Sequence, residues 1–322
     1  MNTEGRRSIK VPVFQTMNGE DVSISVHQFG SSNTGPSIYV GAGTHGNELQ
    51  GVEICRRLLA DLESQDVFGT VTIIPVQNPL AQALRIRLNP IDNKDLDLAY
   101  PGKNNGTATE RLASVLFGFA SSADCVIDLH SGGVGSKNIP HIYVPWAKSK
   151  KSKFSSIETA AIFGADVLIA TQPDVDYHFL LPNLSPFYCN GTTGAAGLYV
   201  ELGEGGLVDD YFVEFGRLGV MNVLRKMGVI KGDVQKQGKL QVVRSTQVVR
   251  SPSSGILKRE YDLGKRVTTD ELLAKVYSLD GKTEAINSPC NGIIQWTVTF
   301  GNTNAGDDVC WIGEDPADYT GM

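Results

Sequence analysis

From about residue 35, short apolar runs alternate with stretches in which apolar residues recur every three or four positions. The first unit has an apolar run at 37–43, a helix-like stretch at 48–62 and a second apolar run at 71–76. A strand, a helix and a strand in this order indicate a parallel pair of strands covered by the connecting helix. Because the alternation continues to about residue 235, we expect an α/β domain over residues 1–235, with a mostly parallel or mixed sheet flanked by helices. The same pattern predicts further helices at 109–119, 155–163 and 210–227 and further strands at 125–129, 142–144, 167–170 and 198–202.

The pattern changes after residue 235. Short β-rich runs are separated there by turn signals such as Ser254-Gly255, Asp280-Gly281 and Asn291-Gly292, and no long stretch has helical periodicity. We therefore predict a small all-β domain over residues 236–322.

Composition and charge narrow the class of protein. The 322 residues carry a net charge of -6, with 41% hydrophobic and 20% charged residues, which is typical of a soluble globular protein. Nucleic acid is not an expected partner, because there is no basic surplus to neutralise phosphates. The five cysteines are scattered without a CxxC pair, which favours buried thiols in a reducing compartment. We expect a cytoplasmic protein, since the chain has no apolar signal segment and no run of the roughly 18 apolar residues that span a membrane.

A histidine and a glutamate three residues apart directly follow the first apolar run. His45 and Glu48 stand in Gly43-Thr-His-Gly-Asn-Glu48, and at the start of a helix this spacing places both side chains on one face. An imidazole and a carboxylate in this arrangement can bind one divalent metal ion. Taken alone, the pair is more typical of an ordinary helix start, where Glu48 favours the helix dipole.

A second histidine changes that interpretation. His130 closes the apolar run at 125–129, and the carboxyl ends of parallel strands meet at one rim of an open sheet. His45, Glu48 and His130 together would leave one tetrahedral position for water, as in catalytic zinc sites. Asp128 shares a strand face with His130, and it either orients an imidazole or is a buried carboxylate held by backbone amides.

Glu201 follows a third apolar run and is a candidate proton shuttle for hydrolysis. Glu204, three residues later, is the nearest rival for this role. The long segment 172–197 before it is rich in Pro, Asn, Gly and Thr, and we expect a loop that shapes the substrate pocket.

Taken together, these residues resemble the succinylglutamate desuccinylase/aspartoacylase family of the zinc carboxypeptidase clan. The matching pieces recur in family order across roughly residues 35–206, which is more specific than any single motif. They are Gly43-Thr-His45-Gly-Asn-Glu48, Asn78-Pro79-Leu-Ala81, Arg87, Asp95-Leu96 with Pro101-Gly102, Thr109-Glu-Arg111, Asp128-Leu-His130-Ser-Gly and Val200-Glu201-Leu-Gly.

The resemblance implies one zinc ion per chain, with His45, Glu48 and His130 as its ligands. It further implies that Glu201 acts as general base and acid. Arg87 would polarise the scissile carbonyl and stabilise the oxyanion, a role suited to a fixed cationic donor. Without the resemblance, a surface salt bridge from Arg87 to a nearby aspartate is the plainer reading.

The chain departs from the family pattern at Asp97-Leu98, where the family usually has an Asn-Arg pair that holds the substrate carboxylate. Leu98 supplies no cation, and Asp97 would repel an anion. We therefore expect a substrate other than N-acetylaspartate or succinylglutamate, with an amine, hydroxyl or cationic group near Asp97. An arginine from elsewhere in the fold could instead restore carboxylate binding. Tyr100 in the same segment is a further candidate substrate contact, with core packing as the alternative.

The C-terminal region resembles the barrel-sandwich fold of biotinyl and lipoyl carrier domains. Lys282, in Asp280-Gly-Lys282-Thr, falls near the hairpin where such domains carry their modified lysine, but the flanking residues match neither carrier signature. We interpret Lys282 as a turn lysine and the domain as a lid or packing element over the crevice.

The sequence as a whole predicts a zinc-dependent amidohydrolase that cleaves an N-acyl amide to a carboxylate and an amine. Its expected partner is a small N-acylated molecule rather than nucleic acid or a membrane, and a homo-oligomer is compatible with this prediction. Two alternatives stay open, a metallocarboxypeptidase that acts on peptides and a non-catalytic zinc-dependent binding protein. Leu98 disfavours the peptidase, which needs a cation for the C-terminal carboxylate.

Overall fold

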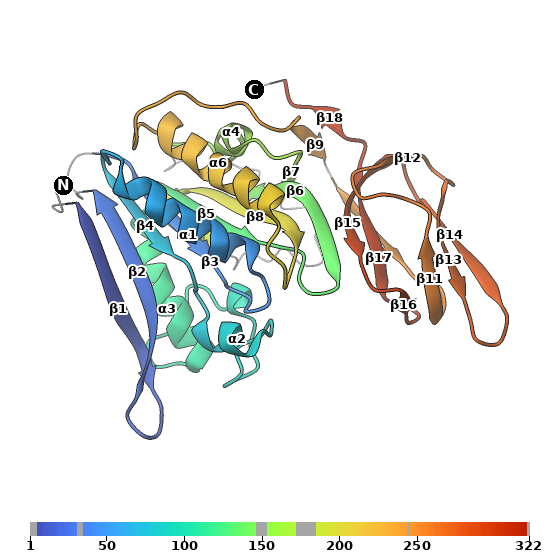
Figure 1. Ribbon diagram of the computed structural model, residues 1–322, viewed down its shortest axis with the longest axis horizontal. Helices are drawn as coiled ribbons and strands as arrows, with labels where there is room; N and C mark the ends of the chain where they lie inside the picture. The colour runs from blue at the N-terminus through green and yellow to red at the C-terminus, as the bar shows by residue number, and fades with distance from the viewer. Residues whose placement is uncertain (1–4, 31–34, 146–152, 172–184, 244, 321–322) are drawn as a thin grey trace.

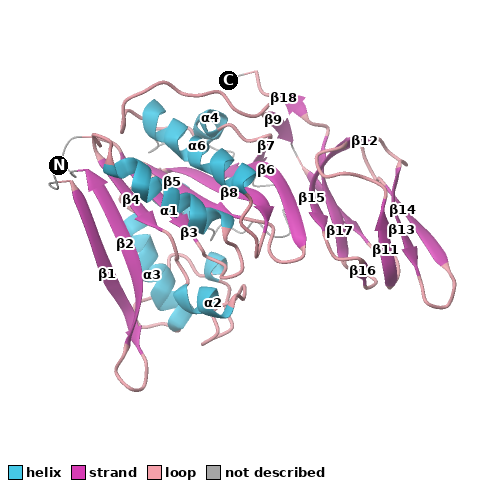
Figure 2. Ribbon diagram, in the orientation of Figure 1, coloured by secondary structure: helices cyan, strands magenta, loops and turns pink. Residues whose placement is uncertain are grey.

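The central strands of the protein are apolar on both faces, and they are buried on both faces in the fold. In the computed structural model, all six residues of β5 (Cys125–His130) are buried in the middle of a large mixed sheet (Figures 1 and 2). A second, smaller sheet lies at the C-terminal end. The predicted α/β class with an all-β C-terminal region is therefore confirmed. The structure describes residues 5–30, 35–145, 153–171, 185–243 and 245–320.

The large sheet combines parallel and antiparallel neighbours. Its main path runs in the order β1 (Arg6–Gln15), β2 (Asp21–Gly30), β4 (Thr70–Ile74), β3 (Ser37–Ala42), β5, β8 (Ala196–Glu204), β6 (Ser136–Pro145), β15 (Gly292–Val298), β17 (Asp308–Glu314) and β10 (Thr246–Arg250). Attached beside this path are β7 (Val167–Thr171), β9 (Gln241–Val243), β12 (Arg266–Val267) and β18 (Ala317–Asp318). The smaller sheet has the order β14 (Thr283–Asn287), β13 (Leu272–Tyr277), β11 (Gly255–Arg259) and β16 (Asn302–Thr303).

Helices cover both faces of the α/β part. One face packs against α1 (Gln50–Glu63), α4 (Ser156–Phe163) and α6 (Asp210–Lys226), which lie together in Figure 1. The opposite face packs against α3 (Ala108–Ala120) and α5 (Ser185–Thr193). Among the described residues, no helix has the length and apolar composition needed to cross a bilayer.

Strand alternation decides which side chains reach each face. In β5, Ile127 and Leu129 belong to the core under α1 and α6, whereas Val126 belongs to the core under α3. Asp128 and His130 have the same parity as Val126, so they point toward the α3 face. The polar end of the strand is thus separated from the main apolar core by the sheet itself.

The structure adds elements that the sequence pattern did not predict. The hairpin of β1 and β2 forms one edge of the sheet, and Pro12 lies there at a register shift, as an edge strand tolerates. A short helix, α2, spans Pro79–Leu84, and its N-cap Asn78 accepts a hydrogen bond from the amide of Ala81. Within the expected loop at 172–197, α5 and the start of β8 are regular structure, and residues 172–184 lie outside the described residues.

The C-terminal β region is joined to the α/β part by strand pairing. β15 runs antiparallel to β6, with Trp296 opposite Asn138, so both regions share one sheet. β9 pairs in parallel with β7, and β18 pairs with β9. Backbone hydrogen bonds therefore hold the C-terminal region beside the carboxyl end of β8.

Candidate active site

The carboxyl ends of three neighbouring parallel strands bring the predicted site residues together. In the ladder, Ala42 of β3 lies beside Leu129 of β5, and His130 of β5 lies beside Glu201 of β8. His45 and Glu48 follow β3 directly. The arrangement follows from the parallel register, since equivalent strand ends meet at one rim.

His45 and Glu48 lie in a turn and not on a helix. Helix α1 begins at Gln50, so the expectation that both residues share a helical face is wrong. The amide of Glu48 instead donates to the carbonyl of His45 at 3.2 Å, which closes a turn that points both side chains the same way. Gly46 permits this turn to pack on α2, because a Cβ at residue 46 would meet the carbonyl oxygen of Ala81 at 2.0 Å.

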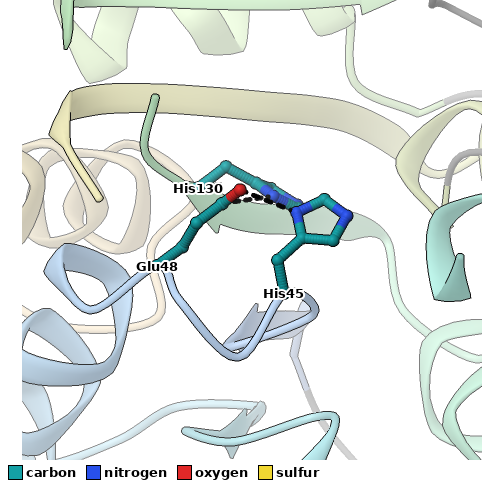
Figure 3. Close-up of side chains that lie close together, drawn as sticks. All are labelled: His45, Glu48 and His130. Carbon is teal, nitrogen blue, oxygen red and sulfur yellow. Dashed lines mark hydrogen bonds and ion pairs between the residues drawn. The ribbon is translucent and has the colours of Figure 1, made fainter. Parts of the chain in front are cut away.

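Two imidazoles and one carboxylate face a common point (Figure 3). The Nδ1 atom of His45 lies 2.8 Å from Oε1 of Glu48, and the Nδ1 atom of His130 lies 3.1 Å from Oε2. One potential ligand atom from each residue lies within 4.8 Å of the others, and all three side chains are buried. Two nitrogens and a carboxylate at this separation fit a divalent ion such as zinc with an open coordination position.

The charges around this point attract a cation. Burial lowers the pKa of His45, but the carboxylates of Glu48 and Asp97 outweigh it and raise that pKa well above its ordinary value. His130 shows the same balance, with burial opposed mainly by Asp128 and Asp97. Positive charge is therefore stabilised here, and a divalent ion would supply it while leaving both imidazoles neutral as ligands.

Each imidazole has carboxylates on the side away from the common point. The Nε2 atom of His130 lies 3.5 Å from Oδ1 of Asp128, and the Nε2 atom of His45 lies 3.1 Å from Asp95 and 3.2 Å from Asp97. Such carboxylates fix the tautomer in which Nδ1 is free to bind a metal.

Gln77 orients the carboxylate of Asp128 through a hydrogen bond. Its amide nitrogen donates to Oδ1 of Asp128 and to Oγ1 of Thr44, both at 2.8 Å. Its amide oxygen accepts hydrogen bonds from the hydroxyls of Tyr39 at 2.8 Å and Tyr100 at 3.3 Å. The structure thus places Tyr100, a predicted substrate contact, against Gln77 and outside the pocket lining.

Glu201 points to the same pocket as Glu48. Burial and the neighbouring charge of Glu48 raise the pKa of Glu201 to about 8, while Nδ2 of Asn138 donates to its Oε2 at 2.9 Å. A carboxyl group with a pKa near neutral can both accept and release a proton. Glu204 instead accepts a hydrogen bond from Thr299 at 2.9 Å, and it does not line the pocket.

Arg87 lies half exposed at the mouth of the site. Its Nε donates to Asp95 at 3.0 Å, and its Nη1 lies 3.6 Å from Oε1 of Glu48 and 3.4 Å from Nδ1 of His45. Burial lowers the pKa of Arg87, but Asp95 and Glu48 outweigh it, so the guanidinium stays charged beside the candidate metal position.

Known proteins share parts of this sequence and its fold. A model of the succinylglutamate desuccinylase/aspartoacylase catalytic domain matches residues 34–227. The chain belongs to this family. The N-alpha-acetyl-L-2,4-diaminobutyric acid deacetylase of Halomonas elongata is 26% identical over 288 residues, which cover 87% of this chain and 82% of the relative. The succinylglutamate desuccinylase of Pseudomonas aeruginosa is 24% identical over 200 residues, which cover 56% of this chain and 55% of the relative.

Solved structures of the family share the whole fold. A succinylglutamate desuccinylase/aspartoacylase from Rhodobacter sphaeroides aligns with a TM-score of 0.84 at 24% identity, covering 98% of this chain and 96% of that one. The product-bound ectoine utilization protein EutE (DoeB) from Ruegeria pomeroyi aligns with a TM-score of 0.83 at 25% identity, covering 96% and 95%.

The pocket of this family member has a volume of about 140 Å³ and includes residues that the sequence argument missed. Tyr199 stacks on His130 at 4.0 Å between ring centroids, and its hydroxyl donates to Oδ2 of Asp97 at 3.0 Å. Tyr199 was within reach of prediction, because it precedes Glu201 by two residues and shares its strand face. Trp296 and Trp311 come from the C-terminal β region, and no local motif marks them.

Proposed function

We propose that this chain is a zinc-dependent deacylase that hydrolyses the amide bond of a small N-acylated compound. The observation that carries the proposal is the convergence of His45, Glu48 and His130 on one point, with Glu48 and Glu201 lining one pocket. Deacylating relatives in the same family support the reaction class.

The chain's own residues supply the remaining parts of the reaction. Zinc, held by His45, Glu48 and His130, would contribute Lewis acidity that makes water nucleophilic at neutral pH. Glu201 takes the proton from the attacking water and passes it to the nitrogen of the leaving amine, for which its raised pKa suits it. Arg87 binds the carbonyl oxygen of the substrate and stabilises the negative charge that develops there.

Asp97 and Leu98 bear on the amine half of the substrate. Both line the pocket, and Asp97 is buried whereas Leu98 is half exposed. A buried carboxylate beside an uncharged leucine disfavours an acidic amine half. We therefore propose a neutral or basic amine half, and the Halomonas relative carries the name of a deacetylase for such a compound.

The reaction is tested by zinc analysis and a hydrolysis screen of N-acetyl and N-succinyl compounds with anionic, neutral and cationic amine halves. Glu201→Gln should retain zinc and lose roughly 100- to 10,000-fold in kcat. Glu204→Gln, three residues away and outside the pocket, is the matched control and should keep full activity. The proposal would be contradicted by full activity of Glu201→Gln. It would also be contradicted if the protein hydrolysed peptides with a free C-terminal carboxylate and none of the N-acyl compounds.

A further inference from the structure

Three strands carry a row of side chains from the catalytic glutamate into the C-terminal β region. Asn138 of β6, which donates to Glu201, lies opposite Trp296 of β15, and Trp296 lies opposite Trp311 of β17. Directly opposed residues on antiparallel strands share one face of the sheet. Both indoles therefore face the pocket that Glu201 lines, as the pocket lining also shows.

A β-bulge turns Trp296 toward this pocket. Ile294 pairs with Ile312, yet Trp296 pairs with Trp311, so Gln295 is an extra residue in β15. In a regular ladder Trp296 would face the same side as Ile294, which is buried in the core of the β region. The bulge reverses that orientation.

The two indoles form a fixed aromatic surface. Their ring centroids lie 4.6 Å apart with an interplanar angle of 19°, and Nε1 of Trp311 donates to Oδ2 of Asp308 at 3.0 Å. The face of tryptophan is the strongest aromatic partner for a cation. We call Trp296 and Trp311 the indole wall.

One carboxylate of the pocket has the complementary charge and is not assigned to the reaction. Among the described residues that line the pocket, Glu48, Asp97 and Glu201 carry carboxyl groups and Arg87 is the one cation. Because Glu48 is a proposed zinc ligand and Glu201 the proposed proton shuttle, Asp97 is the carboxylate left to meet a cation of the substrate. Arg87 is already paired with Asp95 and lies near Glu48. The Oδ1 atom of Asp97 is buried and has no hydrogen-bond partner in the described part of the chain. An unpaired buried carboxylate oxygen is costly unless a ligand donates to it.

We propose that the pocket binds a positively charged group of the substrate's amine half between Asp97 and the indole wall. This deepens the proposed function and rests on it. An ammonium would donate to the free oxygen of Asp97 and lie against an indole face. A neutral alkyl group of the same shape would gain apolar contact but leave Asp97 unpaired.

Calorimetric binding of two amines to the zinc-loaded protein tests the assignment without turnover. The pair is 2,4-diaminobutyrate and 2-aminopentanoate, in which a methyl group replaces the side-chain ammonium. We expect the first to bind about 10- to 100-fold tighter, since a hydrogen bond to a charged group contributes about 1.5–3 kcal/mol. Asp97→Asn should reduce that ratio about 10- to 100-fold, and Trp296→Leu about 2- to 30-fold.

Matched variants separate charge recognition from folding. Trp296→Phe keeps an aromatic face and should retain most of the ratio, while Phe300→Leu alters an exposed aromatic outside the pocket and should leave it unchanged. Thermal melting of each variant identifies any that is unfolded. Equal binding of the two amines, or a ratio that survives both Asp97→Asn and Trp296→Leu, overturns the inference.

The outcomes also distinguish this inference from the proposed function. Glu201-dependent hydrolysis of N-acyl amides with no charge preference in binding removes the cation site and leaves the deacylase intact. A charge preference in binding with no hydrolysis of any amide removes the deacylase and leaves the cation site.

Discussion

The floor and the wall of the pocket are built by different means. The floor comes from the α/β part and consists of charged groups, Glu48, Arg87, Asp97 and Glu201. The indole wall comes from the C-terminal β region and is aromatic and uncharged. The charged groups that the proposed hydrolysis needs thus all come from one part of the chain, whereas the proposed recognition of the substrate combines Asp97 of the floor with aromatic rings from the other part.

The largest expected effect comes from removing a candidate metal ligand beside the floor. His130→Ala should weaken zinc binding about 100- to 1,000-fold, because about 10–16 kcal/mol for the four ligands of a structural zinc site is roughly 2.5–4 kcal/mol for each ligand. Zinc per chain after dialysis against a chelator measures this, with His27→Ala on β2 as the control histidine. Stoichiometric zinc in His130→Ala would exclude the proposed ligand set.

Arg87 tests whether the floor stabilises the transition state. Arg87→Met keeps an unbranched apolar stem but removes the charged guanidinium, and kcat should fall about 100- to 1,000-fold while zinc is retained. Substitutions in the indole wall should instead change the ratio between substrates. If Arg87→Met raised KM and left kcat unchanged, Arg87 would be a binding residue only.

A substitution of Asp128 tests whether the carboxylate next to His130 strengthens zinc binding. Asp128→Asn should lower zinc affinity about 10- to 100-fold, because the imidazole of His130 loses its carboxylate partner. Competition with a chelating dye measures the affinity. Asp124→Asn, just before the other end of β5, should leave it unchanged; equal effects of both changes would count against the assigned role.

The smallest expected effect is a pH dependence of the free energy of unfolding that comes from His141. Burial lowers the pKa of His141 to about 4, although its Nδ1 donates to the carbonyl of Ile139 at 3.0 Å. Because the unfolded pKa is near 6.5, the unfolded chain binds the proton first as the pH falls, and stability is lost between about pH 6.5 and 4.

Urea unfolding at pH 7.5 and 5.5 measures that loss. The wild type should lose about 1.4 kcal/mol more than His141→Gln between these two values. An identical change in both proteins would show that His141 is not buried in its neutral form. Variants of the indole wall such as Trp296→Phe change no ionisable group, so their loss of stability between pH 7.5 and 5.5 should equal that of the wild type.

The alternation of strands and helices in the α/β part and the convergence of His45, Glu48, His130 and Glu201 could be predicted from the sequence. Apolar runs ending in polar residues carry that information, because parallel strand ends meet at one rim. The first residue of α1 could not be predicted from the sequence. The helix begins only after the turn at His45, and that turn depends on the packing of Gly46 against α2. The edge strand β1 was missed where Pro12 interrupts its pattern.

The indole wall lay beyond sequence reasoning for a different reason. Trp296 and Trp311 lie more than 90 residues from Glu201 in the chain and reach it through the pairing of β15 with β6. Pairing between strands that are far apart in the chain produces no periodic pattern in the local sequence, so it could not be predicted from that pattern. Glu201 and Tyr199, two residues apart on one strand, needed only the alternation of β8.

Because of the bulge at Gln295, neighbouring residues of β15 contribute to two different parts of the protein. Before it, Ile294 fills the core of the β region; after it, Trp296 faces the pocket. Changes that disturb the bulge will alter thermal stability and substrate choice at the same time. Laboratory selection for new substrates at this position will therefore meet a trade-off between stability and substrate choice, whereas changes at Leu98, half exposed in the lining of the same pocket, are free of it.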